Sequence, residues 1–184
     1  MTHGNSKPSF AELREATAEL LADHAPDYAP SQIDQFTAQR ATAIDLLSAD
    51  DTVPTMIFVC VHNAGRSQMS AGFARHLAGN RAIVFSGGSD PGPVINPVAV
   101  RAMAEVGIDI ANQFPVPFTE EIVAASDVVV TMGCGDVCPY FPGKRYIDWV
   151  LEDPHGQDLA AVRIVRDEIE RLVTSLLSSL GVGQ

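Results

Sequence analysis

The chain has 184 residues, of which 46% are hydrophobic, which suits the core of one medium domain with a small appendage. Twelve Lys and Arg against 23 Asp and Glu give a formal net charge of −11, which disfavours partners such as nucleic acid and acidic membrane surfaces. No apolar run approaches the roughly 18 residues of a membrane span, and no apolar signal region follows the first residues, so we expect a cytoplasmic protein.

Cysteine usage points to chemistry rather than to structural cross-links. The chain has three cysteines, an odd number. In a protein expected to be cytoplasmic, such a set favours catalytic or redox thiols over a framework of structural disulfides.

The first part of the chain, residues 1–54, is predicted to be a helical extension and linker that precedes a domain over 55–184. Ser9 and Ser31 are expected to cap its two helices, because serine is a preferred N-cap residue. The two segments with apolar residues at helical spacing are 9–22 and 31–47.

From about residue 56 the pattern alternates between apolar runs of strand length and segments of helical spacing. Such alternation predicts an α/β fold, a parallel sheet covered by helices on both faces. In these sheets ligands bind at the C-terminal ends of the strands. The expected strands are 56–60, 82–86 and 127–131, and the expected helices are 67–78, 96–105, 119–124 and 158–180.

The loop between the first strand and the following helix has the features of an oxyanion site. A cysteine and an arginine are separated there by five residues, and the helix N-terminus behind them offers unpaired N–H groups and a positive dipole end, which favour an anion and a reactive thiolate. Gly65 could adopt a positive φ at little cost, and Arg66 offers a planar fork of donors. The residues expected around the anion are His62, Asn63, Ala64, Gly65, Arg66 and Ser67, with Cys60 as nucleophile.

Simpler interpretations of these residues remain open. Cys60 could be a buried core thiol and Arg66 a solvated surface residue, although their position between a strand and a helix favours the catalytic interpretation. Ser67 could hydrogen-bond Cys60 or cap the helix. His62 is also compatible with a surface position on the loop.

A second cysteine pair follows the strand predicted at 127–131. If the segment is helical, Cys134 and Cys138 lie on one face about 6 Å apart, within the range that a disulfide can bridge. A zinc site would need four ligands, and His155 is the imidazole nearest in sequence, so we rank redox exchange above metal binding. A third possibility is that both cysteines stay reduced and pack under a loop. We rank it above zinc binding and below redox exchange, because the glycines and proline of the segment favour mobility and access.

Asp153-Pro154 is the third candidate element. An aspartate before proline is held in an extended or turn conformation, which suits a carboxyl that leans over an anion, although Asp-Pro taken alone is more often simply a turn. Glu152 is the weaker candidate for such a role.

These motifs together resemble a known family. Cys60-x5-Arg66-Ser67 is similar to the anion loop of the low-molecular-weight tyrosine phosphatase fold. Within that fold, the chain from about Met56 to Leu180 resembles the arsenate reductases coupled to thioredoxin. The segments that carry this second resemblance are Ser67-Gln68-Met69, Phe85-Ser86-Gly87-Gly88, Asn96-Pro97, Val106-Gly107-Ile108-Asp109-Ile110 and Asp127-Val128-Val129-Val130-Thr131-Met132 followed by two cysteines.

The resemblance implies a reaction and a role for each residue. Cys60 would attack arsenate held by Arg66 and the loop, with Asp153 as general acid, and Cys134 and Cys138 would carry a thiol–disulfide cascade that thioredoxin resets. The family's cysteine pair is usually spaced more widely than Cys134 and Cys138. Phosphate and sulfate would compete with arsenate for the loop, and no cofactor or metal is expected. Some members bind potassium through a glutamate at the position of Ala71, so no such site is expected here.

Two other functions are compatible with parts of the sequence. A phosphotyrosine or phosphomonoester phosphatase would use Cys60, Arg66 and Asp153 in the same way, with water resolving a phosphocysteine, and would leave Cys134 and Cys138 without a role. A redox- or metalloid-responsive binding module that acts through the N-terminal helices is the non-catalytic alternative.

Overall fold

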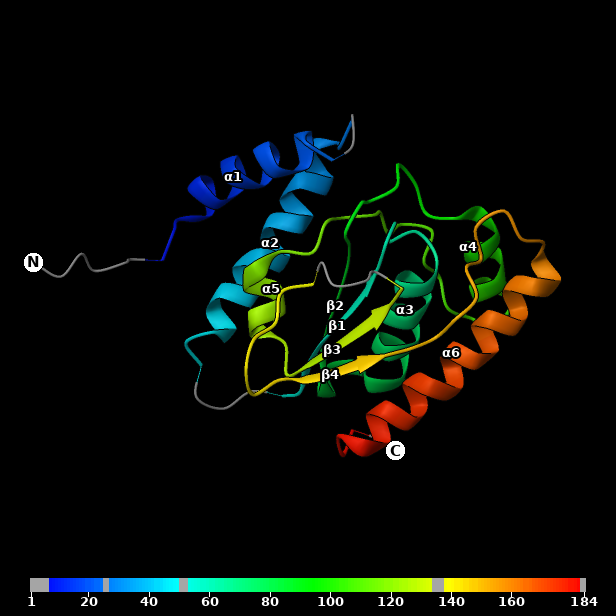
Figure 1. The fold of residues 1–184 in the computed structure, drawn as a ribbon. Coiled ribbons are helices and arrows are strands. Elements are labelled where there is room, and N and C mark those ends of the chain that lie inside the picture. The colour runs from blue at the N-terminus through cyan, green and yellow to red at the C-terminus, as the bar shows by residue number, and fades with distance from the viewer. Residues whose placement is uncertain (1–6, 25–26, 50–52, 134–137, 183–184) are drawn as a thin grey trace, which may run out of the picture.

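A computed structural model describes residues 7–24, 27–49, 53–133 and 138–182. Its centre is a four-stranded sheet in the order β2-β1-β3-β4, with every neighbouring pair parallel (Figure 1). The predicted α/β fold with a parallel sheet is therefore confirmed. The strands are β1 Thr55–Cys60, β2 Ile83–Gly88, β3 Val128–Met132 and β4 Arg145–Asp148.

Strand β4 was not predicted from the sequence. It is four residues long and lies at the edge of the sheet, with exposed Arg145 and Asp148 at its ends and two half-buried residues between them. A short edge strand of this kind has neither an apolar run nor a clear alternation, so its residues do not carry the pattern by which strands are recognised.

Helices cover both faces of the sheet (Figure 1). Each of the six predicted helices is present, with ends that differ by a few residues at most. Helices α3, α4 and α6 lie on one face, and α5 lies on the other with the two N-terminal helices. The helices are α1 Phe10–Ala22, α2 Pro30–Leu46, α3 Arg66–Ala78, α4 Pro97–Ala104, α5 Glu120–Ala125 and α6 Leu159–Ser179, with a 3-10 turn at Gly79–Arg81.

The alternation of β1 divides the hydrophobic interior into two cores. Met56 and Phe58 face α3, α4 and α6, whereas Ile57 and Val59 face α5. All six residues of β1 are buried, as expected for a central strand of a parallel sheet. The strand that ends in Cys60 is thus held between two packed layers.

The N-terminal helices contribute directly to the second core. Leu21 of α1 and Phe36 and Ala43 of α2 are buried in the same cluster as Ile57 and Val59. A poorly exposed ion pair between Arg40 of α2 and Glu121 of α5 adds a polar tie. Helices α1 and α2 therefore contribute buried side chains to the interior of the domain.

The N-cap predictions for these helices had different outcomes. Ser9 caps α1 and forms a capping box with Glu12, as its sequence predicts. The prediction for Ser31 was wrong. Helix α2 begins one residue earlier, at Pro30, because proline at the first helical position has a suitable φ and needs no N–H partner there.

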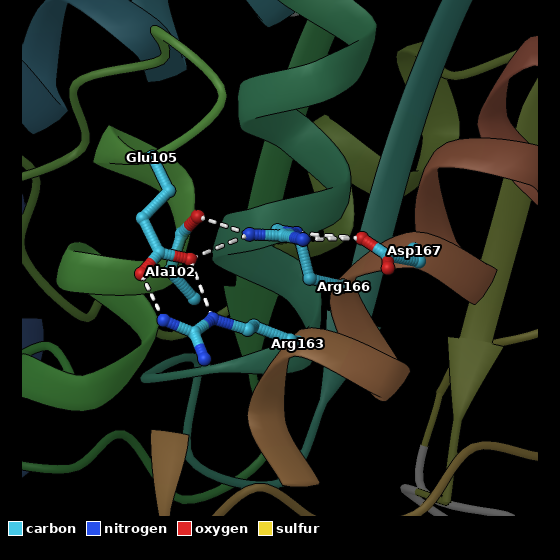
Figure 2. Close-up of polar contacts among 5 residues, drawn as sticks. All are labelled: Ala102, Glu105, Arg163, Arg166 and Asp167. Carbon is cyan, nitrogen blue, oxygen red and sulfur yellow. Dashed lines mark hydrogen bonds and ion pairs between the residues drawn. The ribbon is translucent and has the colours of Figure 1, made fainter. Parts of the chain in front are cut away.

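Helices α4 and α6 are joined by an arginine network (Figure 2). The Arg166 side chain is only 9% exposed, and its Nη1 donates to the Ala102 carbonyl at 2.8 Å and to Glu105 at 3.1 Å. Nε and Nη2 of Arg163 donate to the two oxygens of the same Glu105 carboxylate. Hydrogen bonds and charge from Arg163 and Arg166 lower the pKa of Glu105 to about 2. This network fixes the C-terminal end of α4, whose N-terminal end lies at the site described below.

Within the described part of the chain, none of the helices combines the length and the apolar character that a membrane-spanning segment requires.

Candidate active site

The predicted oxyanion loop connects the C-terminal end of β1 to α3, which begins at Arg66. The residue with the left-handed backbone in this loop is Asn63, with φ 47°, and not Gly65, whose φ is −136°. The freedom of Gly65 to adopt a positive φ is therefore not used here. Asparagine is the side chain that tolerates this region best after glycine, and here both its amide nitrogen and its amide oxygen are hydrogen-bonded to neighbours.

Gly65 is required for a different reason. A Cβ at this position would lie 2.7 Å from Cγ of Pro154, well inside van der Waals contact. Glycine thus lets the Asp153-Pro154 segment pack directly on the loop. The close approach of these two segments brings the carboxyl of Asp153 over the site.

Cys60 lies at the floor of the loop and is almost completely buried. Its Sγ is 3.0 Å from Oγ of Ser67, in the first turn of α3. Nδ2 of Asn63 donates to the same Oγ at 2.8 Å, so the serine hydroxyl hydrogen is left to point at the sulfur. Ser67 can therefore act as a hydrogen-bond donor to Cys60 Sγ. Ser67 is thus hydrogen-bonded to Cys60, and the N-cap position of α3 is occupied by Gly65.

The Asn63 amide is oriented by two further donors. Its Oδ1 accepts from Gln68 Nε2 at 3.0 Å and from the backbone N–H of Val116 at 2.9 Å. Because both lone-pair positions of this oxygen are filled, the NH2 group must face Ser67. Val116 belongs to residues 114–118, which run beside the end of β2 and which we call the strap.

Arg66 and Asp153, which are 87 residues apart in sequence, meet across the loop. Nη2 of Arg66 is 3.0 Å from Oδ2 of Asp153, and Nη1 contacts the Leu151 carbonyl at 3.4 Å. The Arg66 side chain is 11% exposed, whereas that of Asp153 is 51% exposed. The arginine is thus fixed close to Cys60, and the carboxyl can exchange protons with solvent.

A small cavity lies above the cysteine. Its volume is about 30 Å³, against about 420 Å³ for the adjoining groove, so the space directly over Sγ suits a compact group. Of the residues predicted around the anion, Asn63 and Ser67 support the loop from beneath. The cavity is lined by Cys60, His62, Ala64, Gly65, Arg66, Asn96, Asp153, Pro154 and His155.

His62 and His155 stand at the entrance to this cavity, with ring centroids 6.5 Å apart. His62 is exposed, and its Nδ1 lies 3.0 Å from the carbonyl oxygen of Asp90. The backbone N–H of His155 donates to Oδ1 of Asp153 at 3.0 Å, which holds the carboxyl in a tight turn. Both imidazoles are therefore at the rim, and His62 has the surface position that the sequence also allowed.

Asn96 is a site residue whose role was not predicted from the sequence. Its Nδ2 donates to the Pro154 carbonyl at 3.2 Å, its backbone N–H donates to the Ala64 carbonyl at 2.8 Å, and its Oδ1 caps α4. One residue thus joins the anion loop, the Asp-Pro segment and a helix N-terminus. The Asn-Pro pair was visible in the sequence as a helix start and as part of the family resemblance, but it does not reveal the contacts with Ala64 and Pro154.

Of the predicted redox pair, Cys138 lies in the described part of the chain and Cys134 does not. In the β1–β3 register Cys60 is opposite Met132, so the segment after β3 starts next to Cys60, and Gly133 lies close to Nη1 of Arg66. Cys138 is half-buried and packs against the second-face core. Cys134 lies outside the described residues, as does most of the segment that was considered as a helix.

The described residues contain no cluster of three or more His, Cys, Asp or Glu side chains arranged to hold a metal ion. Glu152, the weaker acid candidate, is exposed, and the contacts with Arg66 and the loop are made by its neighbour Asp153. Trp149 packs against Phe58 in the first core, with ring centroids 5.7 Å apart.

Comparison with known proteins identifies the family. Residues 55–183 match the family described as low molecular weight phosphotyrosine protein phosphatase. A putative arsenate reductase of Halobacterium salinarum is 36% identical over 135 residues, which are 71% of this chain and 94% of the relative. Arsenate reductase 1 of Staphylococcus epidermidis is 39% identical over 123 residues, 65% of this chain and 92% of the relative.

A solved structure extends the similarity into the N-terminal helices. The thioredoxin-dependent arsenate reductase of Corynebacterium glutamicum superposes with a TM-score of 0.81 at 35% identity, over 94% of this chain and 85% of that one. A solved arsenate reductase in an oxidized state covers 68% of this chain at a TM-score of 0.62 and 36% identity. The family match, these relatives and the Cys60 loop lead to one conclusion: the chain is an enzyme of the low molecular weight phosphotyrosine protein phosphatase family, in its arsenate reductase branch.

Proposed function

We propose that the protein reduces arsenate to arsenite, as its branch of the family implies, with Cys60 as nucleophile. The observation that carries the proposal is the contact of Cys60 Sγ with Ser67 Oγ at 3.0 Å, beneath a small cavity that Arg66 and Asp153 close together. Arg66 and the N–H groups of the loop bind the arsenate oxygens, since both are donors directed at a negative group.

The first step forms a sulfur–arsenic bond. The Cys60 thiolate attacks arsenic, one oxygen leaves as hydroxide, and Asp153 protonates it to water. The exposed carboxyl of Asp153 can then recover a proton from solvent. The pairing of Asp153 with Arg66 supports this role because it holds the carboxyl at the cavity mouth.

The second step transfers electrons from sulfur to arsenic. Cys134 attacks Cys60, the sulfur–arsenic bonding pair stays with arsenic, and arsenite leaves as a Cys60–Cys134 disulfide forms. Cys138 then attacks Cys134, which releases Cys60 as a thiolate, and thioredoxin reduces the Cys134–Cys138 disulfide. The start of the segment after β3 beside Cys60 and the thioredoxin dependence of the Corynebacterium glutamicum relative support a cascade through this segment.

Arsenate reduction coupled to thioredoxin would make the protein part of a system of arsenic resistance. Phosphate and sulfate are expected to compete for the loop, because they have the same tetrahedral array of oxygens as arsenate. Phosphatase activity is the second candidate function, favoured by the family match and by the fact that Cys60, Arg66 and Asp153 would serve a phosphate ester unchanged.

The test is single turnover with substituted cysteines. In Cys138→Ser, one equivalent of arsenite is expected before the enzyme stops as a Cys60–Cys134 disulfide, which peptide mapping under non-reducing conditions identifies. In Cys134→Ser, the arsenic adduct on Cys60 is not resolved by the protein, and in Cys60→Ser no reaction begins. Repeated turnover of Cys138→Ser with thioredoxin would contradict the cascade, and a trapped Cys60–Cys138 disulfide would exchange the roles of the two cysteines.

A further inference from the structure

The N-terminal helices are connected to the nucleophile by a continuous chain of hydrogen bonds. Tyr28, two residues before the start of α2, donates its hydroxyl to the Pro115 carbonyl of the strap at 2.8 Å. Its ring also meets Phe114 edge to face, with centroids 6.1 Å apart. The next strap residue, Val116, donates its N–H to the side-chain oxygen of Asn63.

From Asn63 the chain reaches the sulfur in two steps. The Asn63 amide donates to Ser67 Oγ at 2.8 Å, and that oxygen is 3.0 Å from Cys60 Sγ. Asn63 can orient the serine in this way only if its own oxygen stays occupied, and one of the two donors to that oxygen is the strap.

The strap is held at this point by several contacts. Gln68 Nε2 donates to the Phe114 carbonyl at 3.3 Å, and Val116 is buried in the second core. The strap is also bonded to the end of β2 through Gly88, which donates to the Val116 carbonyl at 2.9 Å and accepts from Phe118 N–H at 3.2 Å. On its outer side the Tyr28 hydroxyl and ring cover residues 114 and 115. Burial raises the pKa of Tyr28, so its hydroxyl remains a donor over the whole neutral range.

We propose that Tyr28 is a positioning residue of the active site: by holding the strap against the loop, it fixes the Asn63 amide and, through Ser67, the thiolate of Cys60. The helical extension thereby takes part in preparing the nucleophile, in addition to covering the sheet. This inference rests on the proposed role of Cys60, and it makes no use of the later steps of the cascade.

The experiment uses the full chain with Cys134→Ser and Cys138→Ser as the parent, because Cys60 is then its single cysteine. Tyr28→Phe removes only the hydroxyl and keeps the ring on Phe114. The rate of iodoacetamide alkylation is measured against pH, and hydrogen exchange of the strap peptide is followed by mass spectrometry. We expect alkylation in mildly acidic buffer to slow by about threefold, the profile to move to higher pH, and the strap to exchange faster.

The matched control is Thr37→Val, which also removes one hydroxyl from the extension. The Thr37 hydroxyl donates to the Ile33 carbonyl of its own helix and has no hydrogen bond to the described residues of the strap or the loop, so removal of the hydroxyl should leave the alkylation profile unchanged. If Tyr28→Phe gives the same profile as the parent and as Thr37→Val, the positioning role is wrong, even if the strap exchanges faster. In the parent, alkylation of Cys60 should proceed in mildly acidic buffer and should be slowed by phosphate. If it is not, the proposed role of Cys60 as nucleophile is wrong and this inference fails with it.

Discussion

At the scale of single residues, the site depends on a small set of polar side chains with fixed donor and acceptor roles. Ser67 can donate to Cys60 because Asn63 already donates to it, and Asn63 can do so because Gln68 and Val116 occupy its oxygen. The donor or acceptor role of each side chain thus depends on the hydrogen bonds of its neighbour. A substitution that keeps the charge of a site residue but alters its geometry is therefore expected to reduce activity strongly.

Arg66→Lys is such a change. Lysine keeps the positive charge, but it lacks the planar fork that reaches Asp153, the Leu151 carbonyl and an oxyanion together. We expect kcat/KM for arsenate to fall by roughly 10²- to 10³-fold. Steady-state kinetics test this, with Arg101→Lys on the exposed surface of α4 as the control. Equal loss of activity in both variants would show that the fork is not the important feature.

Asp153→Asn tests the proton donor. The amide preserves the size of the side chain but cannot protonate a departing hydroxide, so kcat is expected to fall on the order of 10²-fold. Alkylation of Cys60 should continue at a rate close to that of the parent, since the contact with Ser67 is untouched. Unchanged kcat in Asp153→Asn would exclude this carboxyl as the acid.

The sequence named the candidate reactive residues and Ser67 as a possible hydrogen-bond partner of Cys60, but not the contacts that orient Asn63 and Asn96. Cys60, Arg66 and Asp153 could be identified because the motif and the Asp-Pro pair are local patterns. The left-handed backbone of Asn63 and the bridging role of Asn96 depend on contacts with residues 116 and 154, which are distant in the chain. No local pattern contains such information.

At the scale of elements, the important feature is the close approach of the loop and the Asp-Pro segment. Gly65→Ala would place a methyl group 2.7 Å from the Pro154 ring, so the segment with Asp153 must move outward. We expect kcat/KM to fall on the order of 10- to 100-fold, because a displacement of this size misaligns the acid. Gly92→Ala is the control, since its Cβ would meet nothing nearer than 3.7 Å. Full activity in Gly65→Ala would contradict the packing argument.

The order of the elements was largely predictable from hydrophobic periodicity. Strands β1, β2 and β3 and the six helices follow apolar patterns that burial in a two-faced sheet requires. Strand β4 could not be found in this way, because its residues at the sheet edge are held by pairing with β3 rather than by an apolar pattern of their own.

At the scale of the whole molecule, stability depends on both cores and on the network between α4 and α6. The sequence suggested an appendage at 1–54, but it could not show that Phe36 and Leu21 complete the core behind β1, because periodicity reveals an apolar face and not its partner. The same limit applies to Arg166. Its guanidinium group is buried in the structure, but the sequence alone does not distinguish it from an exposed arginine.

The α4–α6 network predicts a specific dependence of stability on pH. The pKa of Glu105 is lowered to about 2 in the folded protein, from 4.5, so its stabilising contribution is complete above about pH 4.5 and is lost as the pH falls towards 2. Urea unfolding should show that Glu105→Gln is less stable than the parent at pH 6, with a difference that shrinks below pH 4.5. A difference that stays constant from pH 6 to pH 3.5 would contradict this assignment.

The most direct test of the account is a comparison of two reactions of the same purified enzyme. Arsenate turnover is followed by NADPH oxidation with thioredoxin and thioredoxin reductase, and hydrolysis of p-nitrophenyl phosphate is followed beside it. We predict rapid arsenate reduction that requires thioredoxin and is lost in Cys138→Ser, together with slow ester hydrolysis that survives in that variant because hydrolysis needs only Cys60, Arg66 and Asp153. Fast ester hydrolysis without thioredoxin-dependent arsenate reduction would contradict the account and identify the protein as a phosphatase.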